Sequence, residues 1–310
     1  MNYAIFKFNF RTAVHLGDGG MLDSASSSFL ADTLFSALYI ESLKLNLNAQ
    51  LLDYVNEGKL FFSDAFPFKG QLYFLPKPMK HIEGRDVGNS TEKKMLKKIK
   101  YVPSTQLDSF LKSEVDLNEL SRFDFYKLSE DVKVSIRNEE DGGQRGEPKP
   151  YRVGVCTFNE NCGLYVIVGY ENNEVFSFIK SVFESLQFTG IGGKRASGLG
   201  RFVLEIDKNS QQLQRLIERE SESYMTISVS YPADEELNSA LDDASYSLVK
   251  RSGFVLSDTY AQEHRRKLNK FLFASGSCFK NKFRGIVMDV SANSGTHPVY
   301  RYALPMFIGV

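Results

Sequence analysis

Apolar and polar residues alternate at the start of the chain with the period of a β-strand that is buried on one face. Residues 3–10 place Tyr, Ile and Phe between Lys and Asn, and later segments change to the 3.6-residue period of a helix. For the first 75 residues the pattern predicts a strand over 3–10, a helix that Asp32 caps and whose apolar face includes Leu34, Leu38 and Leu45, a second helix over 47–57, and strands at 60–62 and 72–75.

The middle of the chain combines a long polar excursion with a strong pair of strands. Residues 76–103 lie between two prolines and are rich in lysine, which favours a surface segment. Antiparallel strands are predicted at 132–137 and 151–158, and the polar linker at 138–150 is expected to project as a hairpin tip. A strand at 164–170, a helix at 174–187, a loop at 190–198 and a strand at 199–206 follow. The order strand, helix, strands, helix, strand is that of a ferredoxin-like, or RRM-like, unit.

The last third of the chain is predicted to repeat this architecture in a shorter form, although no residue-level repeat is visible. A polar helix over 208–221 reads as a connector. It is followed by strands at 225–231, 246–250, 267–274, 283–290 and 299–307 and a short helix within 234–243. We therefore expect an α+β fold with antiparallel sheets in two ferredoxin-like halves, 1–207 and 223–310, joined by a connector at 208–222.

Charge is unevenly distributed although the net charge is zero. Residues 204–243 carry ten acidic and three basic side chains, whereas 250–310 carry ten basic and three acidic ones, and 92–100 holds five lysines. Such a chain can present one face to phosphates and another to a basic protein neighbour. Charge alone is equally compatible with ordinary solvated surface.

The segment 188–202 carries the most specific chemistry. It holds glycines at 190, 192, 193, 198 and 200, with Lys194, Arg195 and Arg201 and no acid. Glycines allow backbone N–H groups to approach phosphate oxygens, and the cations supply charge. The loop lacks the Gly-Lys-Ser/Thr ending of a Walker loop, and it follows a helix and opens a strand, unlike a dinucleotide fingerprint. The competing interpretation is a structural turn.

Several site classes are disfavoured. Cys156, Cys162 and Cys278 form no CxxC pair, so neither a disulfide framework nor a zinc site is indicated, and a reducing cytoplasm fits best. His81, His264 and His297 lack spaced Asp, Glu or Cys companions, so we expect no metal and no cofactor. No apolar run is long enough to predict a membrane span.

The loop Gly-Ile-Gly-Gly-Lys-Arg-Ala-Ser-Gly-Leu-Gly at 190–200 resembles the glycine-rich loop of the repeat-associated mysterious proteins (the RAMP superfamily) of CRISPR systems. The start at 10–17, Phe-Arg-Thr-Ala-Val-His-Leu-Gly, is similar to the first strand and His-x-Gly turn of that family, and 31–38 resembles its next helix. The segments 248–254, 276–279 and 297–307 resemble the family of the fourth Csm subunit of type III-A effector complexes.

That resemblance implies a role in antiviral defence as a non-catalytic cap that holds the repeat-derived 5′ tag of the guide RNA (crRNA). It implies as partners the large polymerase-like Csm subunit and a backbone Csm subunit of the RAMP superfamily. It also implies that the hairpin at 138–150 is a thumb that wedges between guide and target RNA. From the loop and the resemblance together, the expected RNA-binding residues are His15, Arg137, Gly190, Gly192, Gly193, Lys194, Arg195, Ser197, Gly198, Arg201, Lys250, Arg251 and Arg301.

Two other functions remain open from the sequence. A metal-independent endoribonuclease that processes precursor crRNA would need a general base and a cation, for which His15 and Lys194 are candidates. Asp18 and Asp23 lie in the loop where backbone subunits of the family carry a catalytic Asp, but loop carboxylates beside glycines are more often simply solvated. A pure assembly protein would use the acidic and basic segments only to dock neighbours, and Arg251 and Arg301 could pair with the acidic 204–243 segment as structural salt bridges.

Overall fold

The computed structural model describes residues 1–310 apart from 19, 81–89, 136–148, 258, 262, 264, 293 and 294. Its helices are α1 (Ala31–Lys44), α2 (Asn48–Asn56), α3 (Ser90–Lys98), α4 (Leu107–Leu111), α5 (Leu117–Ser121), α6 (Asn173–Thr189), α7 (Gln211–Glu218) and α8 (Leu237–Leu241). Short 3-10 turns lie at Ser104–Gln106, Arg195–Ser197 and Asp234–Glu236. In the described part of the chain, none of the helices is long and apolar enough to cross a membrane.

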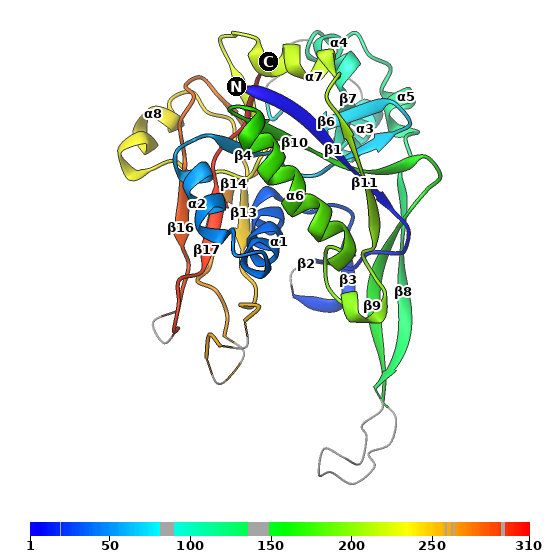
Figure 1. Ribbon diagram of the computed structural model, residues 1–310. Helices are drawn as coiled ribbons and strands as arrows, with labels where there is room; N and C mark the ends of the chain where they lie inside the picture. The colour runs from blue at the N-terminus through cyan, green and yellow to red at the C-terminus, as the bar shows by residue number, and fades with distance from the viewer. Residues whose placement is uncertain are drawn as a thin grey trace, which may run out of the picture.

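One antiparallel sheet organises the N-terminal two thirds (Figure 1). It contains β11 (Phe202–Asp207), β1 (Asn2–Phe10), β10 (Cys162–Tyr170), β5 (Phe66–Lys69), β6 (Leu72–Pro76) and β7 (Tyr101–Pro103) in this spatial order, with β4 (Leu60–Phe62) also paired to β10. The strands predicted at 3–10, 60–62, 72–75, 164–170 and 199–206 are confirmed, as are the helices at 47–57 and 174–187. The strands β5 and β7 were not predicted.

Both faces of this sheet are covered. Residues Ala4, Phe6 and Phe8 of β1 point to the face that α1 and α6 cover. Their neighbour Ile5 points to the opposite face, where it packs with Leu213, Leu216 and Ile217 of α7. Every residue of β10 is buried, as expected for a strand with apolar layers on both sides. The helix predicted as a connector is therefore confirmed as a helix, but it is also part of the core.

The C-terminal third does not form a second sheet of the same kind. Its described residues form three small antiparallel sheets: β12 (Tyr224–Thr226) with β15 (Cys278–Phe279) and β18 (Phe307–Gly309), β13 (Leu248–Arg251) with β14 (Lys270–Phe273), and β16 (Ile286–Asp289) with β17 (Tyr300–Ala303). The strand predicted at 299–307 is divided because Pro305, which has no backbone N–H, lies between β17 and β18.

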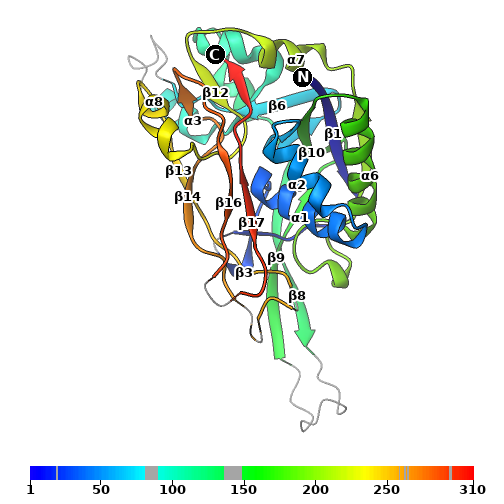
Figure 2. The same cartoon turned by 60° about the vertical axis from the view of Figure 1, so that its left-hand side comes forward.

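The two parts predicted as separate halves share one apolar core. Tyr302 of β17 is fully buried, and its hydroxyl accepts a hydrogen bond of 2.9 Å from the backbone N–H of Phe62. Val229 and Leu272 belong to the same cluster as Phe6 and Phe183. Figure 2 shows β16 and β17 running alongside α1 and α2, so the C-terminal sheets pack directly on the helical layer.

A long hairpin of two described strands projects from this body (Figure 1). Its strands are β8 (Tyr126–Ser135) and β9 (Lys149–Phe158), paired in register from Tyr126 with Phe158 to Ser135 with Lys149. Three apolar side chains on one side of β8 are exposed: Leu128, Val132 and Val134 keep 50–67% of their surface accessible. The predicted tip, including Arg137, lies outside the described residues. A second, shorter hairpin, β2 (Leu16–Asp18) with β3 (Met21–Ser26), packs against the base of β9.

Candidate nucleic-acid interface

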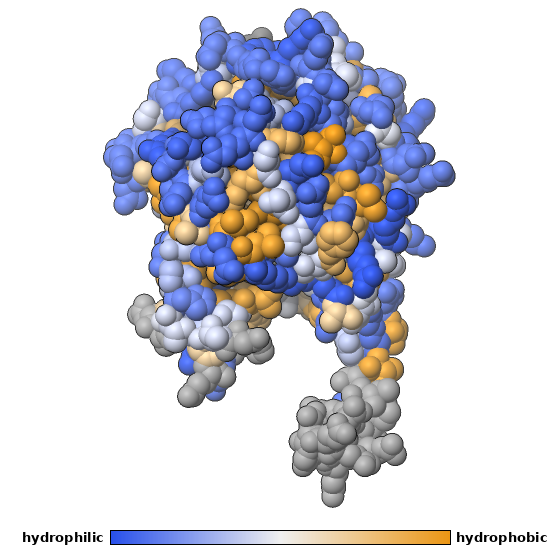
Figure 3. Space-filling model, in the orientation of Figure 1, coloured by the Kyte–Doolittle hydropathy of each residue, from blue (hydrophilic) through white to orange (hydrophobic). Residues whose placement is uncertain are grey.

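A cleft of about 1400 Å³ separates the N-terminal and C-terminal parts of the molecule. Figure 3 shows the lower edge of the molecule notched between the lobe that carries the β8–β9 hairpin and the lobe that carries the C-terminal sheets. Seven of the predicted RNA-binding residues line the cleft: His15, Gly190, Gly192, Gly193, Arg195, Lys250 and Arg251. The fold therefore brings segments of both parts into one basic cleft.

The glycine-rich loop begins where α6 ends. Gly190 is the C-cap of α6 with φ +80°, and its N–H donates to the Leu186 carbonyl over 2.7 Å. Gly192 has φ +90°, and a Cβ there would lie 2.5 Å from the His15 carbonyl oxygen. Both glycines are therefore required by positive φ and by the close passage of neighbouring backbone.

The loop backbone is not arranged as the sequence suggested. Glycines were expected to free N–H groups for phosphate, but the N–H groups of four of them donate within the protein. Those of Gly190, Gly193, Gly198 and Gly200 donate to the carbonyls of Leu186, His15, Arg195 and Ala13. These four N–H groups therefore hold the loop in its shape, whereas the N–H of Gly192 has no hydrogen-bond partner among the described residues.

The basic side chains of the loop have different positions. Lys194 has φ +57°, and its ammonium lies 5.0 Å from the centre of the Tyr151 ring, which brings the loop into contact with strand β9 of the hairpin. Arg195 is half-buried and lines the cleft. Ser197 and Arg201 are exposed. Lys194, Ser197, Gly198 and Arg201 are not among the residues that line the cleft.

His15 is fixed in the wall of the cleft. Its side chain is 7% exposed, and Nδ1 lies 2.7 Å from the Gly154 carbonyl oxygen, so Nδ1 carries the proton that it donates. Its ring packs on Gly193, where a Cβ would lie 2.7 Å from Cδ2. With Nδ1 engaged, Nε2 is the ring nitrogen to which the described residues offer no hydrogen bond, and it is therefore the one considered for a ligand.

The opposite wall contains a charge cluster around Asp32. The Arg251 guanidinium donates from Nε to Asp32 Oδ2 over 2.9 Å and from Nη2 to Oδ1 over 2.8 Å. Arg301 Nη1 lies 3.4 Å from Asp32 Oδ2, and Arg301 is 3% exposed. Arg301, one of the expected RNA contacts, is buried in this structure. Its acidic partner is Asp32, not the 204–243 segment.

Asp32 consequently does not cap its helix. The N-cap of α1 is Leu30, and the N–H of Ala31 donates instead to Asp64 Oδ1 over 2.7 Å. The same oxygen accepts from the N–H of Val229 over 3.0 Å, so Asp64 joins the two parts of the molecule below the cleft. Burial raises the pKa of Asp64 to about 6, although both backbone donors favour the ionised form.

Sequence reasoning missed two residues of the cleft. Asp64 sits within an apolar run, Phe-Phe-Ser-Asp-Ala-Phe at 61–66, and a lone acid in such a run is a signal of a buried, hydrogen-bonded carboxylate. Lys267 ends the basic run at 265–267 and lines the cleft.

The other groups considered from the sequence take structural positions. Within the described ranges no cluster of three or more His, Cys, Asp or Glu could hold a metal. His297 Nε2 lies 2.9 Å from Ser257 Oγ, whereas His81 and His264 fall outside the described residues. The three cysteines are buried as free thiols, and burial raises the pKa of Cys156 to about 12.

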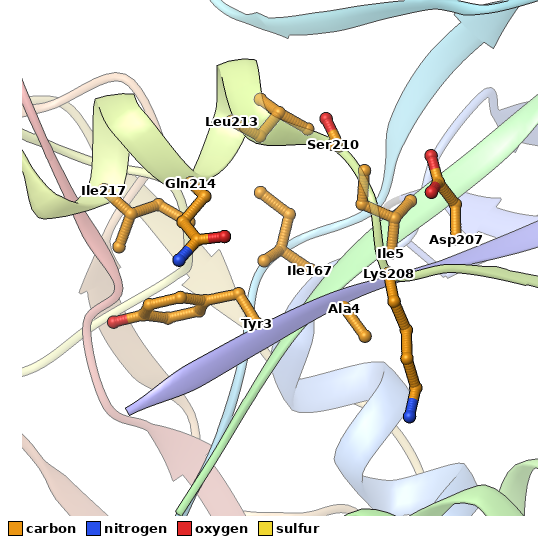
Figure 4. A pocket seen from close by; sticks show the side chains of 10 residues that line it. All are labelled: Tyr3, Ala4, Ile5, Ile167, Asp207, Lys208, Ser210, Leu213, Gln214 and Ile217. Atoms are coloured by element: carbon orange, nitrogen blue, oxygen red, sulfur yellow. The ribbon is translucent and has the colours of Figure 1, made fainter.

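A second cavity, between β1 and α7, is too small for a ligand. Figure 4 shows Tyr3 and Ile5 of β1 facing Leu213 and Ile217 of α7 around it. Its volume is about 10 Å³, which is about the space of one water molecule. The large cleft is therefore the candidate interface.

Comparison with known proteins finds matches to one family along almost the whole chain. The model of the RAMP superfamily matches residues 7–203, and the model of the CRISPR Csm4 C-terminal domain matches 219–310. The CRISPR system Cms protein Csm4 of Mycobacterium tuberculosis (strain ATCC 25618 / H37Rv) is 37% identical, with 100% of this chain and 98% of that protein covered.

Two solved structures share the fold. A chain of the Csm3-Csm4 subcomplex in the type III-A CRISPR-Cas interference complex is matched with a TM-score of 0.66 and 19% identity, over 100% of this chain and 99% of the matched one. The Csm1–Csm4 cassette in complex with cA4 gives a TM-score of 0.62 and 18% identity, over 99% of this chain and 97% of the matched one.

Proposed function

Because the chain belongs to the Csm4 family of the RAMP superfamily, we propose that it is the RNA-binding structural subunit of a type III-A CRISPR complex that holds the 5′ repeat-derived tag of the crRNA. The observation that carries this proposal is the basic cleft into which both parts of the chain contribute predicted contacts. Its volume and the basic side chains that line it suit an RNA strand, whose affinity comes mainly from phosphate contacts.

The proposal extends to the partners. Related Csm4 proteins are found with Csm3 in one structure and with Csm1 in another. We propose that this chain bridges the same two neighbours, the backbone subunit and the large subunit, and that the β8–β9 hairpin is the thumb that meets target RNA. The exposed apolar side chains of Leu128, Val132 and Val134 support this role, since aliphatic side chains can make apolar contacts with the faces of bases.

We also interpret the N-terminal sheet as one ferredoxin-like half. Its strands β1, β4 with β5, β10 and β11 and its helices α1 and α6 follow the chain order strand, helix, strand, strand, helix, strand. Strands β1 and β10 are central and β11 is at the edge. This arrangement places the glycine-rich loop between α6 and β11, next to the turn that carries His15.

The test of the proposed function is the double substitution Lys194→Ala with Arg195→Ala. We expect it to weaken crRNA binding and to lower the slope of log affinity against log salt by about one to two units, because Arg195 lines the cleft and Lys194 is its neighbour on the same loop. The measurement is a salt titration of crRNA affinity. Lys112→Ala with Arg122→Ala removes two exposed cations outside the cleft and should leave the slope unchanged. Equal slopes for both double variants would remove the loop from the RNA site.

A second expected result concerns the hairpin. Replacing 136–148 by a two-residue Asn-Gly turn should leave folding and complex assembly nearly unchanged, because Ser135 and Lys149 already face each other and all pairs from Tyr126–Phe158 to Ser135–Lys149 are kept. What should change is the stacking of guide and target bases beside the tag, measured by fluorescence of a 2-aminopurine placed there. A Gly/Ser tip of the original length is the control for length alone. Loss of folding would show that the segment belongs to the core.

A ribonuclease, the alternative function, would use the same cleft, because its candidate base His15 lines it. His15 keeps Nε2 for a ligand, as a general base would require, but it is equally suited to hold RNA as a fixed hydrogen-bonding group. Incubating the wild-type protein with precursor crRNA separates the two. Cleavage that His15→Ala abolishes would favour the nuclease, whereas tag binding without cleavage supports the cap.

A further inference from the structure

The wall of the cleft formed by the C-terminal part carries more positive charge than its acidic partners balance. Lys267 lies beside the Asp32 cluster, with its ammonium 3.5 Å from Ser36 Oγ, and it is half-buried. Arg251, Arg301 and Lys267 thus surround one carboxylate, Asp32. Asp64 is the second acid near the cluster.

This excess charge is costly to the protein alone. Burial, with repulsion from Arg301 and Arg251, lowers the pKa of Lys267. Arg301 Nε is buried and has no hydrogen-bond partner among the described residues. A protein that keeps partly buried cations in excess of acids, inside a cleft, is arranged to receive an anion.

Arg251 has the geometry to bind one. Its Nε donates to Asp32, and its Nη2 donates to Asp32 and Thr33, so the orientation of the guanidinium is fixed. Among the described residues, the two N–H groups of Nη1 are the donors left for a ligand. Its side chain keeps 23% of its surface exposed, and both Arg251 and Lys267 line the cleft. Across the cleft stands Arg195 of the glycine-rich loop.

We propose that Lys267 and Arg251 form a phosphate subsite that binds one phosphodiester group of the crRNA on this wall of the cleft, while Asp32 positions the guanidinium. The subsite rests on the proposed function and specifies where the strand is held opposite the glycine-rich loop. Lys267 supplies a point charge and Arg251 a planar donor pair, a combination suited to a phosphate with two free oxygens.

The experiment compares Lys267→Met and Lys267→Arg in the full-length protein. Lys267→Met should bind crRNA about tenfold more weakly, with a salt slope lower by about one unit. It should also raise the melting temperature of the RNA-free protein by roughly 2 °C, because a charge that disfavours folding is removed. Lys267→Arg should keep the slope. Lys280→Met, at an exposed lysine outside the cleft, should change neither quantity.

A methylphosphonate scan of the crRNA locates the contact. Neutralising one phosphate at a time should weaken binding to the wild type at one position where Lys267→Met is insensitive. If Lys267→Met lowers the melting temperature and leaves affinity and slope unchanged, the lysine is structural and the subsite is wrong. If the wild type itself binds crRNA without salt dependence, the proposed function is wrong, and the subsite with it.

Discussion

Asp32→Asn is expected to destabilise the protein by about 3–5 kcal/mol, because it leaves two arginines without their counter-charge in a buried site. Asp32 is 5% exposed and Arg301 3% exposed, so water cannot replace the lost carboxylate at Arg301, whereas Arg251 keeps 23% of its side chain exposed to the cleft. Asparagine keeps the size of the side chain, and the effect therefore reports charge and hydrogen bonding rather than a cavity. The measurement is urea unfolding of the variant and the wild type.

Two further variants make this result interpretable. Asp108→Asn removes the partner of Arg219 in an exposed pair of 2.6 Å and should cost less than about 1 kcal/mol. Arg301→Met added to Asp32→Asn should recover part of the loss, because one unpaired buried charge is removed with it. A loss below about 1 kcal/mol for Asp32→Asn, or no recovery in the double variant, would contradict the buried ion-pair account.

The elements with a clear period were predictable from the sequence, and the exceptions have physical causes. Strand β10 is apolar throughout and β1 alternates, so both were found. Strand β5 was missed because Pro67 lies inside it, paired with Leu164, and proline in a short run normally indicates a loop. Strands β4 and β5 pair with different stretches of β10, and the break between them buries Asp64.

The C-terminal part was harder to predict because its strands depend on tertiary contacts. The predicted strand at 225–231 is paired as a strand only over Tyr224–Thr226, and then continues as a single bridge between Ser230 and Phe273. Strands of three or four residues are too short to show a clear alternation of apolar and polar side chains, so their pairing partners cannot be predicted from sequence. The shared core around Tyr302 likewise has no local signal of its own.

The two walls of the cleft also differ in how far the sequence predicts them. The glycine-rich loop is one continuous segment, so its glycines and cations were visible as a motif. In the Asp32 cluster, Arg251 is 219 positions and Arg301 is 269 positions from Asp32 along the chain. The sequence around Asp32 therefore contains no signal that predicts these two partners. Composition identified both as charged residues in a basic segment, but only the fold shows that one lines the cleft and the other is buried beneath it.

Gly200→Ala is expected to disrupt the glycine-rich loop, whereas Gly198→Ala should be tolerated. Both glycines have positive φ, +76° and +85°, so each alanine carries backbone strain of about 1–2 kcal/mol. At Gly200 a Cβ would in addition lie 2.0 Å from the Ile191 carbonyl oxygen, whereas at Gly198 nothing lies within 4 Å.

The clash at Gly200 cannot be relieved locally. The Ile191 N–H donates to the Gly200 carbonyl over 3.0 Å, and the Gly200 N–H donates to the Ala13 carbonyl over 2.9 Å, so moving the loop breaks its attachment to the turn that carries His15. We therefore expect Gly200→Ala to lower crRNA affinity at least tenfold, which corresponds to about 1.4 kcal/mol of binding free energy. We also expect it to lower the free energy of unfolding more than Gly198→Ala does. Thermal unfolding and crRNA titration of the two variants side by side measure both effects. Equal losses for the two alanines would show that positive φ, and not the close backbone contact, determines the shape of the loop.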